Sequence, residues 1–157
     1  MKQSNLQKIQ NNLRNKFLRL GVKMVGPETI HFSKDTKIGK NVTIEPYVVF
    51  GTKVKIGNNV TIKSFSHLEN CKVENKVEIG PYARIRPGVL LKEGSKIGNF
   101  VEIKKSTLGK KSKVKIGNNV TIKSFSHLEN CKIENKVDIG PYARIRPGTV
   151  LKEGSKI

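Results

Sequence analysis

The sequence predicts an all-β solenoid, because large apolar residues recur every six positions, glycine often follows them, and a longer unit repeats after sixty residues. Six is a multiple of the two-residue strand period, so every repeat presents the same face inward, whereas a helical period of 3.6 does not fit. One five-residue step interrupts the count before Val73. The repeat positions are Phe32, Ile38, Ile44, Phe50, Ile56, Ile62, Leu68, Val73, Ile79, Ile85, Leu91, Ile97 and Ile103.

Two positions of each repeat are expected to fill the core of this solenoid. Four places after an aliphatic comes a small or β-branched residue, such as Val42 or Ala83, and glycines such as Gly39 and Gly57 follow the aliphatic directly. Short strands joined at glycine-rich corners, three to a coil, close into a triangular prism. From Phe32 we count about seven coils, and at roughly 4.8 Å per coil the prism is on the order of 30 Å long.

The N-terminal segment has a helical pattern instead. Apolar residues spaced by three or four positions form the stripe of an amphipathic helix: Leu6, Ile9, Leu13, Phe17 and Leu20. Gly21 suits the end of that helix. We therefore divide the chain into a helix and linker, residues 1–21, and a β-helix, residues 22–157. The helix is expected to pack over the open first coil; the alternative is an arm that leads to a further N-terminal domain.

Residues 54–97 recur as residues 114–157 with four substitutions, which indicates a recent or engineered duplication. The junction is imperfect. Counting forward from Leu108 puts Val114 at an inward aliphatic position, whereas counting back from Ile116 puts it at a small position, so we expect a bulge or corner loop there. The second copy stops at Ile157, which predicts a truncated chain whose open last coil exposes strand edges and promotes aggregation.

Composition limits the classes of function. The formal net charge is +19, from 31 basic and 12 acidic residues, which raises a polyanion hypothesis. Aromatic residues make up only 6% and tryptophan is absent, so stacking platforms are lacking and nucleic-acid binding is disfavoured. The sequence has no secretory signal pattern and no apolar run of about 20 residues, so we expect a cytoplasmic protein without a membrane segment.

Cysteine and histidine offer no metal or nucleophile site. Cys71 and Cys131 occupy the same place in the two copies and fit a reduced compartment. His31, His67 and His127 are too scattered for a three-histidine zinc site, and the last two are expected to be solvated corner residues. We predict no metal.

Two motifs are more specific than the six-residue repeat. Residues 79–88 read Ile-Gly-Pro-Tyr-Ala-Arg-Ile-Arg-Pro-Gly, and residues 97–105 read Ile-Gly-Asn-Phe-Val-Glu-Ile-Lys-Lys. Over residues 13–113 the chain resembles the acetyltransferase domain of the bacterial bifunctional UDP-N-acetylglucosamine pyrophosphorylase/glucosamine-1-phosphate N-acetyltransferase. The resemblance implies a left-handed parallel β-helix of hexapeptide repeats and a homotrimer. It also implies a place in UDP-N-acetylglucosamine and peptidoglycan precursor synthesis, with acetyl-CoA as cofactor if the chain is active.

The resemblance also suggests a substrate site. In that family the second arginine of the first motif and the first lysine of the second bind the sugar phosphate, and these positions are Arg86 and Lys104. Both directly follow an inward aliphatic and lie three sides apart, so we expect them to stack on adjacent coils roughly 5 Å apart. A bound phosphate would relieve their repulsion. Alternatively, Glu69, one coil below, pairs with Arg86 and no ligand is needed.

The chain departs from the family at the position of the catalytic base. The family's catalytic histidine and a substrate-contacting tyrosine fall on Ile116 and Asn119, and neither can replace the base, which typically contributes about 10² to 10⁴ in rate. The second copy does not rebuild the site, because sixty residues make ten sides and Arg146 must lie on another face than Arg86. The nucleotidyltransferase domain and the coils that carry the acetyl-CoA contacts are missing.

Three functions stay open. The first, which we prefer, is a catalytically impaired relative of the acetyltransferase, acting at most as a folded scaffold with no catalytic residue. The second is an active acetyl-CoA-dependent N-acetyltransferase that uses another base. The third is a module that binds a sugar phosphate or another anion through Arg86 and Lys104.

Overall fold

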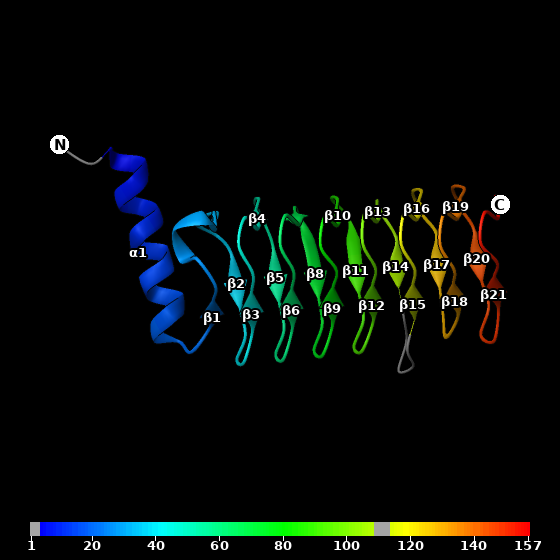
Figure 1. Cartoon of the computed structure of the whole chain (residues 1–157), viewed down its shortest axis with the longest axis horizontal. Helices are drawn as coiled ribbons and strands as arrows, with labels where there is room; N and C mark the ends of the chain where they lie inside the picture. Colours follow the sequence, from blue (N-terminus) through cyan, green and yellow to red (C-terminus); the bar gives the residue numbers. More distant parts are fainter. Residues whose placement is uncertain (1–3, 109–113) are drawn as a thin grey trace.

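The computed structural model describes residues 4–108 and 114–157 and consists of one helix followed by a parallel β-solenoid of about seven coils (Figure 1). The strands are two or three residues long and form three sheets, one for each side of the prism. The predicted fold class is confirmed, and the architecture is consistent with a left-handed hexapeptide-repeat β-helix. In the described residues, no helix is long and apolar enough to span a membrane.

The three sheets are named A, B and C. Sheet A contains β1 Lys23–Met24, β3 Thr43–Ile44, β6 Thr61–Ile62, β9 Glu78–Ile79, β12 Lys96–Ile97, β15 Lys115–Ile116, β18 Lys132–Ile133 and β21 Val150–Leu151. Sheet B contains β4 Val49–Phe50, β7 His67–Leu68, β10 Arg84–Ile85, β13 Glu102–Ile103, β16 Thr121–Ile122 and β19 Asp138–Ile139. Sheet C contains β2 Lys37–Ile38, β5 Lys55–Ile56, β8 Cys71–Val73, β11 Val89–Leu91, β14 Thr107–Leu108, β17 His127–Leu128 and β20 Arg144–Ile145.

The repeat aliphatics stack in register along the axis of the prism. Ile44 pairs with Ile62 in sheet A and Ile85 with Ile103 in sheet B, and all four side chains are buried. The residue before each aliphatic points outward, as the period of two requires. Corners turn sharply because residues such as Tyr47 and Asn59 adopt left-handed backbone angles, with φ of 61° and 56°. The core is therefore a column of aliphatics, and polar chemistry is confined to the outer faces and the corners.

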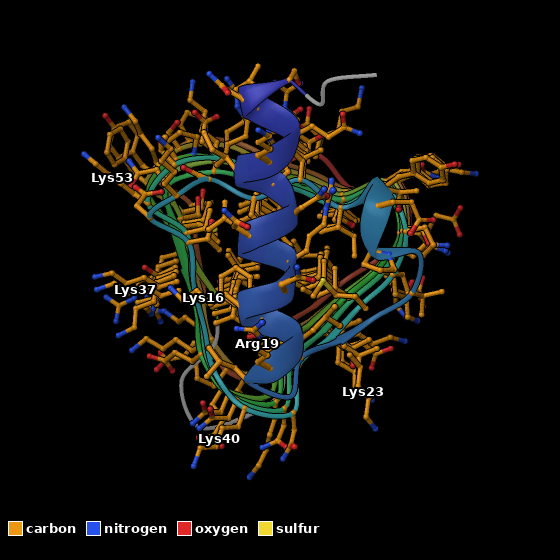
Figure 2. The ribbon with its side chains drawn as sticks, turned by 90° about the vertical axis from the view of Figure 1, so that its left-hand side faces the viewer. Lys16, Arg19, Lys23, Lys37, Lys40 and Lys53 are labelled. Carbon is orange, nitrogen blue, oxygen red and sulfur yellow. The ribbon has the colours of Figure 1, made fainter. Side chains whose placement is uncertain are left out.

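The helix α1 Asn5–Arg19 lies across the open end of the first coil, as predicted (Figure 2). Phe17 is buried, with its ring centroid 4.7 Å from that of Phe32. The Gln10 amide accepts a hydrogen bond from the Phe32 N–H and donates one to its carbonyl, so the helix supplies the backbone partners that a preceding coil would supply. The predicted stripe is partly wrong, because Leu6 and Leu20 at its ends are exposed beyond the edge of the prism. A 3-10 helix, η1 Pro27–Thr29, follows β1.

At the junction of the two copies the structure favours the backward count. Leu108 in sheet C and Ile116 in sheet A are both buried, although eight residues separate them where six would suffice. Val114 is fully buried at the small position, and its carbonyl accepts from the N–H of Lys96. The predicted bulge falls on residues 109–113, which lie outside the described residues.

Candidate functional site

The two predicted phosphate ligands lie on adjacent coils of sheet B. Arg86 follows β10 and Lys104 follows β13, and these strands pair in register. The N–H of Arg86 donates to the carbonyl of Ile103 at 2.9 Å, which places the two residues side by side. Neighbouring strands are about 4.8 Å apart, so two cationic side chains project from one face at that spacing.

Arg86 and Lys104 line one cavity of about 350 Å³ on the outer face of sheet B. Apart from Glu102, its other walls come from the second copy and include two hydroxyl groups and a third cation. The remaining lining residues are Glu102, Thr121, Ile122, Lys123, Ser124 and Pro141. The cavity therefore offers cationic and hydroxyl donors together, which suits an anion that accepts several hydrogen bonds.

The acidic partner of Arg86 is Glu102, and not Glu69 as the alternative without a ligand proposed. The guanidinium Nη1 lies 3.0 Å from the Glu102 carboxylate, and the two side chains are 38% and 41% exposed. Both acids lie on a coil next to that of Arg86, so spacing alone could not choose between them. An ion pair this exposed contributes at most about 1 kcal/mol, so it competes only weakly with a ligand.

Lys104 differs from its two neighbours in charge balance. Lys123, the third cation of the cavity, lies 3.5 Å from the Asp138 carboxylate, whereas Lys104 has no salt bridge to a described residue. The central cation of the column is therefore the least neutralised. Sequence reasoning missed Lys123, although it directly follows the inward Ile122; the broken count at the junction hid its face.

Ile116, which the family resemblance puts at the position of the catalytic base, lies inside the prism. Ile116 is 5% exposed and pairs with Ile97 and Ile133 in sheet A. Any side chain there points into the aliphatic core and away from the cavity on sheet B. Asn119, at the position of the family's tyrosine, lies at a corner with φ of 54°, where its N–H donates to the carbonyl of Asn99.

The second copy places Arg146 on another face of the prism than Arg86, as predicted. Arg146 follows β20 in sheet C, whereas Arg86 follows β10 in sheet B. The shift is general: each strand of the second copy lies one sheet further round the prism than its counterpart, as β16 in sheet B does relative to β6 in sheet A. Equivalent residues therefore lie on different sheets, and only their neighbours within the copied segment stay the same.

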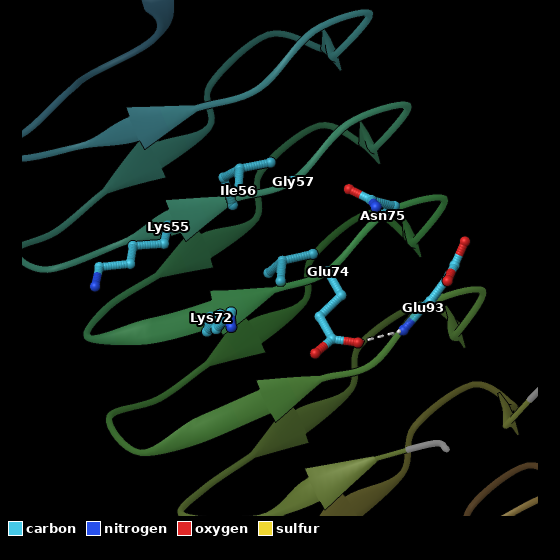
Figure 3. A pocket seen from close by; sticks show the side chains of 8 residues that line it. Lys55, Ile56, Gly57, Lys72, Glu74, Asn75 and Glu93 are labelled. Carbon is cyan, nitrogen blue, oxygen red and sulfur yellow. Dashed lines mark hydrogen bonds between the residues drawn. The ribbon is translucent and has the colours of Figure 1, made fainter. Parts of the chain in front are cut away.

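A pair of equivalent cavities shows the same shift. The first, of about 350 Å³, lies on sheet C and is lined in part by Lys55, Lys72 and Glu74 (Figure 3). The second, of about 280 Å³, lies on sheet A and is lined by the corresponding residues of the other copy. In both, a glutamate of one coil accepts a hydrogen bond from the backbone of the next coil, at 3.1 and 3.2 Å. Neither lining includes a histidine, a cysteine or a hydroxyl side chain.

The histidines and cysteines have structural surroundings. The expectation of corner histidines is wrong: His67 and His127 are strand residues in β7 and β17, directly before an inward leucine. Burial raises the pKa of Cys71 to about 12 and that of Cys131 to about 11, so both thiols are protonated at neutral pH. Within the described ranges, no three histidine, cysteine or acidic residues are grouped to hold a metal ion.

Comparisons with known proteins agree with the repeat architecture. The sequence matches the family described as bacterial transferase hexapeptide (six repeats) over residues 35–70, 70–105 and 113–147. It is 53% identical to the bifunctional protein GlmU of Zymomonas mobilis subsp. mobilis over 105 residues, which are 67% of this chain and 23% of that protein. It is 44% identical to GlmU of Wolbachia pipientis wMel over 131 residues, 83% of this chain and 29% of that protein. The chain thus spans about a quarter of these relatives.

Solved structures agree with the fold. The chain superposes on the UDP-N-acetylglucosamine O-acyltransferase (LpxA) of Moraxella catarrhalis RH4 with a TM-score of 0.61, at 16% identity, over 85% of this chain and 62% of that one. The corresponding LpxA of Bacteroides fragilis 9343 gives a TM-score of 0.59 at 18% identity, over 80% of this chain and 54% of that one. At such identities the likeness concerns the fold alone.

Proposed function

Because the chain belongs to the bacterial transferase hexapeptide family, we propose that it is a catalytically impaired relative of the glucosamine-1-phosphate N-acetyltransferase domain that still binds a sugar phosphate. One observation carries the proposal. Arg86 and Lys104, which the resemblance gives as phosphate ligands, line one cavity, whereas Ile116, which it gives as the position of the base, is a core residue.

The cavity suits a phosphate because its cations are spaced for one. A phosphoryl group placed between Arg86 and Lys104 accepts charge-assisted hydrogen bonds from both, and the guanidinium can bind two oxygens at once. It also supplies the negative charge that Lys104 lacks among its described neighbours. Ser124 and Thr121 add hydroxyl donors at the rim. A sugar hydroxyl or amine would then lie toward solvent.

We infer that acetyl transfer is impaired because the side chain of residue 116 points into the core. An amine that attacks acetyl-CoA must lose a proton, and a positioned base contributes about 10² to 10⁴ in rate. A base at residue 116 would have to reach the outer face of sheet B from inside the prism. We propose acetyl-CoA as cofactor only for the alternative, an enzyme that uses another base. In either case we propose a cytoplasmic homotrimer, on the family resemblance, which sedimentation can test.

Calorimetric titration with glucosamine 1-phosphate tests the proposal. We expect the full chain to bind it more tightly than glucosamine, and Arg86→Ala to weaken binding by about tenfold or more, since a charge-assisted hydrogen bond is lost. Arg146→Ala is the matched control, because it removes the same residue from the other copy, on sheet C. Equal effects of the two variants, or no preference for the phosphorylated sugar, would contradict the proposed site.

A further inference from the structure

The column of cations on sheet B has a third member that the second copy contributes. Strands β10, β13 and β16 are successive neighbours, with Ile85 paired to Ile103 and Ile103 to Ile122. The N–H of Lys104 donates to the carbonyl of Ile122 at 3.1 Å. Lys123 therefore follows Lys104 in the column as Lys104 follows Arg86.

All three cations reach one cavity. Arg86, Lys104 and Lys123 line the same volume of about 350 Å³. They span two coil steps, or roughly 10 Å at the usual separation of strands. A single phosphoryl group can lie between two neighbouring cations but does not reach from the first to the third. An anion with two linked phosphoryl groups can contact all three.

The charges of the cavity favour such a ligand. Glu102 is paired with Arg86 at 3.0 Å and Asp138 lies 3.5 Å from Lys123, whereas Lys104 between them has no described carboxylate partner. Three cations and two carboxylates leave a positive excess centred on Lys104. Both ion pairs are solvent-exposed, so their carboxylates can swing aside at little cost.

We propose that Lys123 is a third phosphate-binding cation of this site and that the site prefers a diphosphate group to a single phosphate. This inference rests on the proposed function, since it takes Arg86 and Lys104 as phosphate ligands. It assigns a role to a residue that exists at this place only because the duplication moved it there.

The first copy provides the matched control. Lys63 is the same residue of the repeat as Lys123, but it follows β6 in sheet A and lies 3.1 Å from Glu78. It is not among the residues that line the cavity. Removing either lysine changes the net charge of the chain by one, so a difference between the two variants reports position and not total charge.

Titration of the full chain with inorganic phosphate and with pyrophosphate, at one ionic strength and pH, tests the inference. We expect the wild-type chain to bind pyrophosphate about tenfold more tightly than phosphate, because one more charge-assisted contact forms. Lys123→Ala should remove most of this preference and change phosphate binding by no more than about twofold. Lys63→Ala should keep the preference, and Arg86→Ala should weaken both anions.

Lys123→Arg guards against a merely folding-related loss, since it keeps the charge and should keep the preference. If Lys123→Ala kept the preference for pyrophosphate, the proposed role of Lys123 would be overturned. The proposed function would still stand if Arg86→Ala weakened the binding of both anions. An equal loss of the pyrophosphate preference in the Lys63→Ala and Lys123→Ala variants would also overturn the role of Lys123, because the preference would then depend on net charge alone. If the wild-type chain bound neither phosphate nor pyrophosphate, both the role of Lys123 and the proposed function would be contradicted.

Discussion

The two copies of the duplicated segment are nearly identical in sequence, but their equivalent strands lie on different sheets of the prism. In the first copy Lys55 and Lys72 stack with Lys37 on sheet C and form no salt bridge with a described residue. In the second copy Lys115 stacks between Lys96 and Lys132 on sheet A, and carboxylates are paired with both of these neighbours. Their place in the solenoid decides what equivalent residues contact.

The comparison also separates what the repeat conserves from what it does not. Inward residues keep their role in both copies, because every side of the prism faces the same aliphatic core. Outward residues keep a partner that lies within the copied segment, but the shift of one sheet changes the neighbours that lie outside it. Two ion pairs survive the shift, since both members of each lie within the copied segment. Lys63–Glu78 recurs as Lys123–Asp138, and Lys76–Glu93 recurs as Lys136–Glu153. Function on this scaffold is therefore a property of a column of coils rather than of one repeat.

The largest expected effect tests whether equivalent inward residues of the two copies contribute equally to stability. Leu68 and Leu128 are equivalent and fully buried, one in sheet B and one in sheet C. Each Leu→Ala variant should lower the free energy of unfolding by about 2 to 5 kcal/mol, through lost burial and the cavity left behind. Chemical denaturation measures both. Costs that differ by more than about 2 kcal/mol would mean that the copies do not share one continuous core.

The cysteines give a smaller and graded effect. Burial raises the pKa of Cys71 to about 12 and of Cys131 to about 11, from an ordinary value near 9. Thiolate is the reactive form, so alkylation of the folded chain at pH 8 should be slow at both sites and faster at Cys131. Mass spectrometry of alkylated peptides over time gives the two rates. Rapid labelling of Cys71 would show that its coil opens or is less closely packed.

The smallest expected effect concerns how the stability contributed by Glu78 depends on pH. Hydrogen bonding and charge from Lys63, with a smaller contribution from Lys96, hold the pKa of Glu78 below its ordinary value. A carboxyl with a lowered folded pKa contributes stability above its unfolded value, near 4.5, and loses it as pH falls below that. Glu78→Gln should therefore reduce stability at pH 7 by less than about 1 kcal/mol, since the pair is exposed, and should leave stability at pH 3 nearly unchanged. Thermal denaturation at the two pH values measures this; a larger loss at pH 3 would contradict the sign.

Much of the fold could be predicted because large apolar residues recur every six positions in the sequence. The inward position of Ile85 and Ile103 follows from counting, and the stacking of Arg86 and Lys104 follows from their separation by three sides. The hand of the coil needed a resemblance, because periodicity is the same in a coil of either hand. The helix lies within the N-terminal segment where its pattern predicts it, but the predicted stripe is longer than the face that the helix covers.

What could not be predicted depends on where the count breaks and on side-chain choice. Eight residues link Leu108 to Ile116 where six would be regular, so the face of Lys123 could not be read by counting forward. Glu69 and Glu102 are both one coil from Arg86, and only side-chain geometry selects Glu102. The corner assignment of His67 was avoidable, since it directly precedes the inward Leu68.

The most direct test of the central claim, a sugar-phosphate site without a catalytic base, is release of free CoA thiol from acetyl-CoA in the presence of glucosamine 1-phosphate. The folded full chain is assayed at saturating glucosamine 1-phosphate, beside a full-length GlmU as positive control. We predict turnover at least about 10²-fold below that control, because the position of the base holds a buried isoleucine. Turnover near that of the control, abolished by Arg86→Ala, would contradict the account and show that another residue supplies the base.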